Sequence, residues 1–553
     1  MPLNKEAITS ALNASAGNIK GAQKVLRERG FRFRDSKLSA LIRDFQVSEL
    51  DPDPIKPETL MPHIREPVVG GVIEAPDKRR AKAQGKTFVF TCAQNNTLLH
   101  ERFWKALQYY VDDRKAELHV SRFVYNKAGA SAADGKADTE NKSDKDSLWY
   151  DPRIEQFASD ESLQITPDLV WCGELNIIPT AKTPLSTLST YTRQCSGIIP
   201  HTKMHMQSVP TMKFEPVRLM YTTGTCTQRN YIQRVAGQVA EFHHVFGALV
   251  VEVDNAGNWW ARQLNADKFG GFYDLDTYYT PDGIDEDSHR IEAITHGDLH
   301  GLKIDSSIFD AVFKEGGIVD MLLPREQFFH DTIDFMPRNH HNIKDPHFLH
   351  KMWVDGTESV AAEFDAAAGL LQMADRPWCK SYIVESNHDV AFHQWLRDTS
   401  AFYDPPNMEF WLKHNLISAY DVRAGRQSKP FKEAITRAIK SLELNVGFIG
   451  EDDSYKILGV IEAGLHGHLG PNGSRGSPKN LRTVGKANTA HTHSAGIIDG
   501  IYTAGVYGKL DMGYNKGLSS WSHSCIITYP NAKRSILTIR NGKAWRDIPG
   551  DRL

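Results

Sequence analysis

Short apolar runs alternate with amphipathic stretches along the first half of the chain after residue 85. The runs have the length and residue types of buried strands, and the amphipathic stretches repeat apolar positions with the helical period. Strands are predicted at 87–91, 117–125, 169–172, 217–221 and 246–253, and helices at 95–110, capped by Asn95, Asn96 and Thr97, and at 231–243. This alternation predicts an α/β domain over 86–290, with a role in substrate positioning or subunit contacts.

The first 45 residues have a different pattern, with three short helical repeats at 5–12, 18–29 and 36–45. They contain nine basic and four acidic residues, a net charge of +5. The spacing of Ala11-Leu12, Gly17-Asn18, Ala22, Leu26 and Gly30 resembles the Fis-type helix-turn-helix, with a longer turn. The resemblance implies DNA binding by residues 1–50, while a basic helical hairpin for protein contacts stays open. The basic side chains expected to contact DNA are Lys20, Lys24, Arg27, Arg32, Arg34 and Lys37.

Five prolines between residues 52 and 67 predict an extended linker over 51–85. A second polar stretch, 127–147, is rich in Ala, Gly, Asp, Lys and Ser and is expected to be a disordered surface loop. The predicted organisation is therefore a helical unit (1–50), a linker (51–85), an α/β domain (86–290) and a final domain (291–553).

The final domain contains five segments that end in acidic, amide or imidazole side chains, most of them after an apolar strand-like run. Side chains two residues apart at a strand end point the same way, so Asp298 and His300 converge. The five segments are 294–301, 327–335, 382–389, 460–468 and 489–496, and none contains cysteine. Oxygen and nitrogen ligands without thiolates suit manganese, magnesium, iron or zinc.

The order D-x-H, D, N-H-D, H-G-H, H-x-H resembles that of the calcineurin-like metallophosphoesterases, over nearly half of the chain. Three flanking positions depart from the family pattern: His330, Ser386 and Ala490 stand where glycine is usual. The resemblance implies an α/β fold, in which a β-sandwich is flanked by helices on both outer faces (α-β-β-α).

The resemblance also implies a role for each motif residue. Asp298, His300 and His493 would bind one divalent ion, Asn387, His466 and His491 a second, and Asp331 both. His388 would face the phosphate and protonate the leaving oxygen, oriented by Asp389. Two alternatives stay open at the ligand level, because His468 competes with His466 and Asp334 competes with Asp331. Mn²⁺ is the metal expected first.

A basic segment connects the fourth and fifth motifs. Residues 469–489 contain no acid and are rich in Gly, Ser and Asn. Because both ends join metal-binding motifs, the segment is expected to lie beside the site and to follow a polyanion's backbone. A solvated loop is the alternative. The residues expected to bind substrate are Arg475, Lys479, Arg482 and Lys486.

Composition limits the compartment and the partners. The chain of 553 residues is 41% hydrophobic and 24% charged, with a net charge of only −3, so nucleic-acid binding would depend on local patches. It lacks a secretory signal and any apolar run of about 18 residues, so no membrane span is expected. Six scattered cysteines without C-x-x-C spacing favour a reducing cytoplasm.

Two further segments of the final domain have predicted secondary structure. Residues 405–444 are expected to form a helical insertion, and residues 500–545 are expected to return to strands that complete the sheet.

Three functions remain in competition. The first is a DNA endo- or exonuclease, favoured by the basic N-terminal helices and the basic loop. The second is a phosphomonoesterase or protein phosphatase, and the third is a DNA-binding host-takeover protein without activity. The overall layout is also similar to the early host-DNA-degrading nucleases of T-five-like phages. That similarity implies a manganese-dependent DNase in the infected bacterial cytoplasm, acting on DNA as a homo-oligomer, with other early phage or host proteins as further partners.

Overall fold

The computed structural model describes residues 10, 19–29, 79–125, 148–213, 215–285, 287–339 and 342–546. The chain forms two compact units, Met1–Pro62 and His63–Leu553. In the first unit, helix α2 (Ile19–Glu28) confirms the helix predicted at 18–29. The helices predicted at 5–12 and 36–45 lie outside the described residues, except for Ser10. The linker up to residue 78 and the loop 127–147 also lie outside them.

The second unit is mixed α/β and contains several sheets, the largest with eleven strands. Strands β7 (Met206–Val209) and β21 (Gly496–Ile498) pair in this sheet, with Met206 opposite Ile497. Their pairing joins segments from both sides of residue 290, so the predicted boundary at 290/291 is wrong: one sheet runs across it. The strand order is β1 (Arg79–Arg80), β4 (Ser162–Thr166), β5 (Leu169–Cys172), β6 (Ser196–Ile199), β8 (Arg218–Thr222), β7 (Met206–Val209), β21 (Gly496–Ile498), β22 (Ile501–Thr503), β20 (Ala487–Thr489), β19 (Ile461–Glu462) and β18 (Lys456–Ile457).

A six-stranded sheet provides the parallel strands that lead to the predicted motifs. Its order is β17 (Val446–Ile449), β16 (Lys380–Val384), β15 (Glu326–Phe329), β14 (Ala293–Thr295), β23 (Ser524–Thr528) and β24 (Arg534–Thr538). The first four of these strands are mutually parallel. Parallel pairing aligns the carboxyl ends of β14, β15 and β16 along one edge, which is where polar side chains can meet.

A four-stranded sheet lies beside β24. Its order is β10 (Trp259–Asn265), β9 (Gly247–Val253), β2 (Thr87–Gln94) and β3 (Glu117–Phe123). The Gln263 backbone N–H donates to Ser535 Oγ at 3.0 Å, and Asn265 Nδ2 donates to the Arg534 carbonyl at 2.8 Å. These side-chain bonds join the four- and six-stranded sheets into one layer. A small sheet of β11 (Phe272–Asp274), β12 (Thr277–Thr280) and β13 (Gly283–Ile284) adjoins it.

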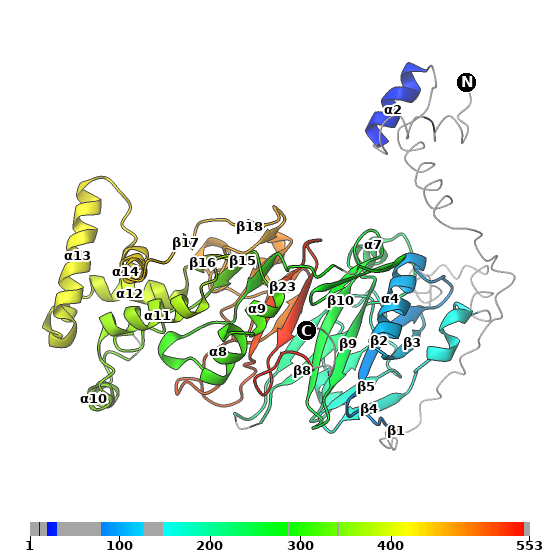
Figure 1. Cartoon of the computed structure of the whole chain (residues 1–553), viewed down its shortest axis with the longest axis horizontal. Coiled ribbons are helices and arrows are strands. Elements are labelled where there is room, and N and C mark those ends of the chain that lie inside the picture. The colour runs from blue at the N-terminus through cyan, green and yellow to red at the C-terminus, as the bar shows by residue number, and fades with distance from the viewer. Residues whose placement is uncertain are drawn as a thin grey trace, which may run out of the picture. The chain divides into compact units, whose positions relative to one another are not determined.

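This combined layer faces the eleven-stranded sheet across two apolar cores. In β14 the side chains alternate: Ala293 packs toward β18 and β19, and Ile294 packs toward helices on the opposite face. Those helices are α8 (Ser306–Phe313), α9 (Ile318–Leu322), α11 (Val360–Ala374), α12 (Asn387–Arg397) and α14 (Pro430–Lys440) (Figure 1). Helix α4 (Glu101–Asp113) covers the four-stranded part in the same way.

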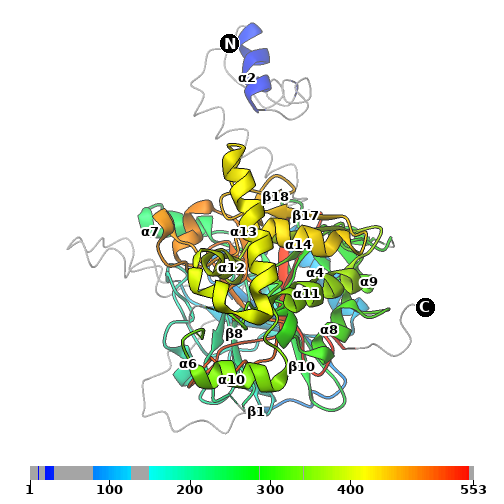
Figure 2. The ribbon, with the colours of Figure 1, turned by 90° about the vertical axis from the view of Figure 1, so that its left-hand side faces the viewer.

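The outer face of the eleven-stranded sheet carries short elements. They include α6 (Leu188–Tyr191) and the 3₁₀ helix η8 (Asn480–Val484), packed through Leu188 and Leu481. Helices α10 (Pro346–Asp355) and α13 (Met408–Arg423) lie at the end of the second unit, beside α11, α12 and α14 (Figure 1). Figure 2 looks onto this end, with α13 in front.

Most predicted elements are present, with shifted ends. Strand β5 has the predicted bounds, and β2, β3, β8 and β9 match to within three residues. The helix predicted from residue 95 begins at Glu101, because the half-buried His100, whose pKa burial lowers to about 4, accepts from the Phe103 N–H at 3.1 Å and caps it. Helix α7 (Val235–Phe242) is shorter than predicted. The helical segment 405–444 and the strands within 500–545 are confirmed.

The helices and the cysteines can be compared with the expectations about membrane spans and disulfides. None of the described helices has the length and apolar character needed to cross a bilayer. All six cysteines are free thiols, and five of them are buried.

A buried ion cluster ties the four-stranded sheet to the small sheet. The fully buried Arg262 guanidinium donates to Glu252 at 2.8 Å and to Asp274 at 2.7 Å, and the Tyr110 hydroxyl donates to Asp274 at 2.9 Å. Burial opposes ionisation of Asp274, but Arg262 holds the pKa of its carboxyl below the ordinary value. Removing the guanidinium would leave the buried carboxylate of Glu252 without its cation and that of Asp274 with only Arg114, 3.7 Å away.

Arg262→Met is therefore expected to lower the free energy of unfolding by about 3–5 kcal/mol. The measurement is urea unfolding followed by circular dichroism. Arg437→Met is the control, because Arg437 pairs with Glu433 on the exposed surface of α14, where a pair contributes less than about 1 kcal/mol. Equal, small effects of both substitutions would contradict a structural role for the cluster.

Candidate metal centre

The five predicted motif segments meet where the two large sheets face each other. Asp298 and His300 follow β14, Asp331 follows β15, and Asn387 follows β16, all from the six-stranded sheet. From the eleven-stranded sheet, His466 follows β19, and His491 and His493 follow β20. The edges of two sheets thus bring seven predicted ligands together, and these side chains form two groups that share Asp331.

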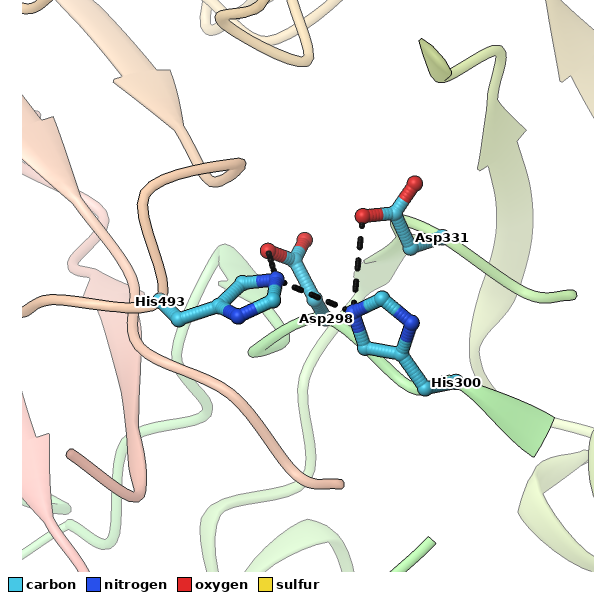
Figure 3. A group of neighbouring side chains, drawn as sticks. All are labelled: Asp298, His300, Asp331 and His493. Atoms are coloured by element: carbon cyan, nitrogen blue, oxygen red, sulfur yellow. Dashed lines mark hydrogen bonds and ion pairs between the residues drawn. The ribbon is translucent and has the colours of Figure 1, made fainter. Parts of the chain in front are cut away.

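The first group consists of Asp298, His300, Asp331 and His493, all buried, with one ligand atom of each within 4.8 Å of the others (Figure 3). His493 Nε2 lies 3.2 Å from Asp298 Oδ2 and 2.9 Å from His300 Nε2. His300 Nε2 lies 3.6 Å from Asp331 Oδ2. These four residues could hold a metal ion, because carboxylate oxygens and imidazole nitrogens converge on one point.

The second group lies on the other side of Asp331. Asn387 Oδ1 is 3.0 Å from His466 Nε2 and 3.0 Å from His491 Nδ1. His466 Nε2 is also 3.5 Å from Asp331 Oδ2, the oxygen that faces His300. Asp331 is therefore common to both groups, as the sequence predicted, whereas Asp334 is not.

Both competing residues have other partners. Asp334 Oδ1 is 3.0 Å from His300 Nδ1, so it orients the ring whose Nε2 faces the group. His468 Nε2 is 2.7 Å from Glu451 Oε1, which directs it away from Asn387 and leaves that place to His466. These contacts favour Asp331 and His466 over the two competitors, although Asp334 also forms, with His300 and His388, a cluster whose ligand atoms lie within 4.8 Å of one another.

The carboxylates of Asp298 and Asp331 are buried, and among the described residues no donor forms a hydrogen bond with either. Burial, together with the charge of Asp331, raises the pKa of Asp298 well above its ordinary value. Burial also opposes ionisation of Asp331, but His466, His388 and His300 lower its pKa. Two buried acids without donors need positive charge, so the donor set fits a divalent cation.

The backbone at the centre is strained. His300, Asp331, His491 and His493 have φ values of 49°, 44°, 69° and 56°, in the left-handed region. Such conformations cost roughly 1–3 kcal/mol each and cluster at functional sites. By contrast, His330, Ser386 and Ala490, which stand where the calcineurin-like pattern usually has glycine, have negative φ values, so their backbone conformation does not require glycine.

His388 lies at the rim of the first group. Its Nδ1 donates to the Asp334 carbonyl at 2.7 Å, and its ring centre is 4.9 Å from that of His300. Burial disfavours the imidazolium, but Asp331 and Asp334 raise the pKa of His388 above its ordinary value. His388 therefore favours a proton at its other nitrogen, Nε2.

The predicted role of Asp389 as the partner of His388 is wrong. Its carboxylate accepts from the Ser386 N–H at 2.8 Å and from Ser386 Oγ at 2.9 Å, which closes a capping box at the start of α12. The spacing Ser386-x-x-Asp389 is a capping signal that the sequence already contained. Asp334 holds His388 instead.

One chain resembles this one along most of its length. The sequence is 40% identical over 489 residues to "Protein A1" of Escherichia phage T5, and the match covers 86% of each chain. The chain belongs to the family of that protein. No family model matches the chain, and no solved structure does.

In this member of the Protein A1 family, the basic segment 469–489 is anchored next to the second group. The Gly476 N–H donates to the His468 carbonyl at 2.7 Å, and the segment contains the short helices η7 (Pro471–Gly473) and η8. Arg482 donates to Asp499 at 2.9 Å, so its charge is partly offset. The four predicted substrate-binding residues are all exposed: Arg475, Lys479, Arg482 and Lys486.

Only part of the predicted N-terminal DNA-binding set is described. Lys20, Lys24 and Arg27 lie on α2, and Lys24 and Arg27 are exposed. The remaining three, Arg32, Arg34 and Lys37, lie outside the described residues.

Sequence reasoning missed three contributors. Asp334 was considered only as a ligand, and Glu363 of α11 was not considered. Glu363 accepts from the Asp334 and Phe335 N–H groups at 2.8 and 2.7 Å and so fixes the turn that carries Asp334. Trp521 packs edge-on against His493, with ring centres 4.2 Å apart. Their contacts join residues far apart in the sequence, so no local pattern reveals them.

Asp298→Asn is expected to separate metal binding from folding. Because a buried carboxylate is replaced by a neutral isostere, the metal-free protein should be at least as stable as the unmodified protein. The stabilisation by Mn²⁺, about 2.7 kcal/mol at one hundred times its Kd, should disappear.

The measurement is thermal unfolding with and without Mn²⁺. Asp365→Asn, on an exposed position of α11, is the matched control and should keep the full metal effect. Retention of that effect by Asp298→Asn would argue against a metal ligand at this position.

Proposed function

We propose that the protein is a metal-dependent DNA phosphodiesterase of the calcineurin-like type, with a centre for two divalent ions. One observation carries the proposal. Seven side chains that can bind metal, from the ends of five strands, lie together in two groups, and Asp331 belongs to both. The two facing sheets with helices outside them support the corresponding sandwich fold.

The distances among the seven side chains suggest which of them would bind each ion. Asp298, His300 and His493 would hold one ion, and Asn387, His466 and His491 would hold the other, with Asp331 serving both. Mn²⁺ is proposed first, because the set offers oxygen and nitrogen without thiolate, and Mg²⁺, Fe²⁺ or Zn²⁺ are the alternatives. When bound, such ions polarise a phosphoryl group and lower the pKa of water.

His388 would act as the general acid. Its Nδ1 is committed to the Asp334 carbonyl, which leaves Nε2 to give a proton to the leaving oxygen. The negative charges of Asp331 and Asp334 favour the protonated ring. Asp334 and Glu363 would keep this ring and His300 in position.

DNA is the substrate class that the charged surfaces support best. The basic segment 469–489 is tied to the second group through Gly476, and its exposed cations could follow a phosphate backbone. The basic helix α2 adds a further set of cations. The phage relative supports a phage setting, in which the enzyme would degrade DNA in the infected bacterial cytoplasm.

A homo-oligomer is also proposed, on the basis of α13. Leu412, Leu416 and Tyr420 form a stripe of exposed apolar side chains along this helix, 44%, 54% and 55% exposed. Glu409 and Arg423 lie seven residues on either side of Leu416. An antiparallel copy centred on Leu416 would therefore place opposite charges together at both ends of the stripe.

The purified protein is expected to degrade DNA in the presence of Mn²⁺ and to lose this activity with EDTA. His388→Ala should keep its bound metal but lose about 10²–10⁴-fold in turnover, because only the proton donor is removed. The measurements are gel assays on plasmid and linear DNA, with metal content by mass spectrometry.

His414→Ala is a matched control, because His414 is a buried histidine between aromatic rings of α12 and α13. It should keep most of the activity per folded molecule. Robust hydrolysis of p-nitrophenyl phosphate without DNA cleavage would favour a phosphomonoesterase instead. DNA binding without hydrolysis of any phosphoester would favour a silent host-takeover protein.

A further inference from the structure

The segment between β22 and β23 is fixed to the metal centre at both ends. At its start, the Tyr507 N–H donates to the Asp298 carbonyl at 2.8 Å, and Val506 forms a bridge with Asp298. At its end, the Ser522 N–H donates to the His493 carbonyl at 2.9 Å. Two residues of the first group thus hold the loop 508–521 beside that group.

Two aromatic side chains of this loop form a wall next to the centre. The Trp521 ring packs edge-on against His493, and the Tyr514 ring packs edge-on against Trp521, with centres 5.9 Å apart. The Tyr514 hydroxyl donates to the sulfur of the buried Met512 at 3.0 Å, which fixes its ring. Tyr514 is nevertheless 44% exposed, so one part of the ring is open to a ligand.

The ring contacts from His493 through Trp521 to Tyr514 place the Tyr514 ring beside the metal centre. Burial, followed by the charges of Asp334, Asp331 and Asp298, raises the pKa of its phenol. The ring therefore stays neutral while it experiences the carboxylates of the centre. The loop also exposes Lys509 and Lys516, and its acid Asp511 is 3.0 Å from Lys213.

A phosphate group does not stack on a neutral aromatic ring, whereas a planar group attached to the phosphate can stack on it. Nucleobases stack on aromatic side chains independently of sequence, and the nearby lysines suit the adjoining phosphates. A phosphomonoester of a small alcohol would gain nothing from Tyr514.

We propose that Tyr514, supported by Trp521, stacks on a nucleobase next to the scissile phosphate and positions a nucleic-acid strand in the centre. This inference rests on the proposed phosphodiesterase function and specifies its substrate as a strand with an accessible base. Tyr514 is a positioning residue, because the ring holds the strand and takes no proton.

The test compares Tyr514→Ala with the unmodified protein on two substrates in Mn²⁺: a single-stranded DNA oligonucleotide and an abasic phosphodiester oligomer of the same length, in which tetrahydrofuran units replace every nucleoside and no planar group is present. On DNA, kcat/KM should fall about ten- to a hundredfold, mainly through KM, because a stacking contact is lost. On the base-free diester it should change less than about twofold. Tyr514→Phe keeps the ring and should restore cleavage of DNA.

Tyr109→Ala, which removes a tyrosine of α4 that is 41% exposed, is the control and should leave kcat/KM unchanged on both substrates. An equal loss on both substrates, an unchanged kcat/KM on DNA, or failure of Tyr514→Phe to restore it would each overturn the stacking role alone. If the unmodified protein cleaves neither substrate, the proposed function fails and this inference falls with it.

Discussion

The architecture of the second unit depends on an electrostatic requirement at its centre. Asp298 and Asp331 are buried where two sheets meet, and among the described residues no hydrogen-bond donor satisfies their carboxylates. A folded chain rarely keeps such groups without compensating charge. The surrounding imidazoles provide part of that charge, and a divalent cation would provide the rest. The left-handed backbone at His300, Asp331, His491 and His493 adds a conformational cost at the same place.

The cluster of Asp, Asn and His side chains that could hold metal was the part most open to prediction from sequence. A triplet such as Asp298-Leu-His300 carries little information alone, but most of the five segments follow an apolar run. Parallel strands bring their carboxyl ends to one edge, so polar residues after β14, β15 and β16 must be neighbours. The convergence of His466 and His491 on Asn387 confirms that the remaining segments reach the same place from the facing sheet.

Non-local contacts explain what the sequence did not predict. The boundary at 290/291 was inferred from a change in motif content, but the pairing of β7 with β21 depends on the whole chain. Asp334 and Glu363 meet through a turn and a helix far apart in sequence. Tyr514 and Trp521 lie in a loop without periodicity, and only its two anchors to Asp298 and His493 reveal their position. The error at Asp389 was different, because a local capping signal was present and the family role was preferred.

The most direct test of the two-ion centre is anomalous scattering from crystals of the protein soaked in MnCl₂. The account predicts two anomalous peaks, one among Asp298, His300 and His493 and one among Asn387, His466 and His491, with Asp331 between them. A single peak in the cluster, or none, would contradict the two-ion centre on which the proposed chemistry depends.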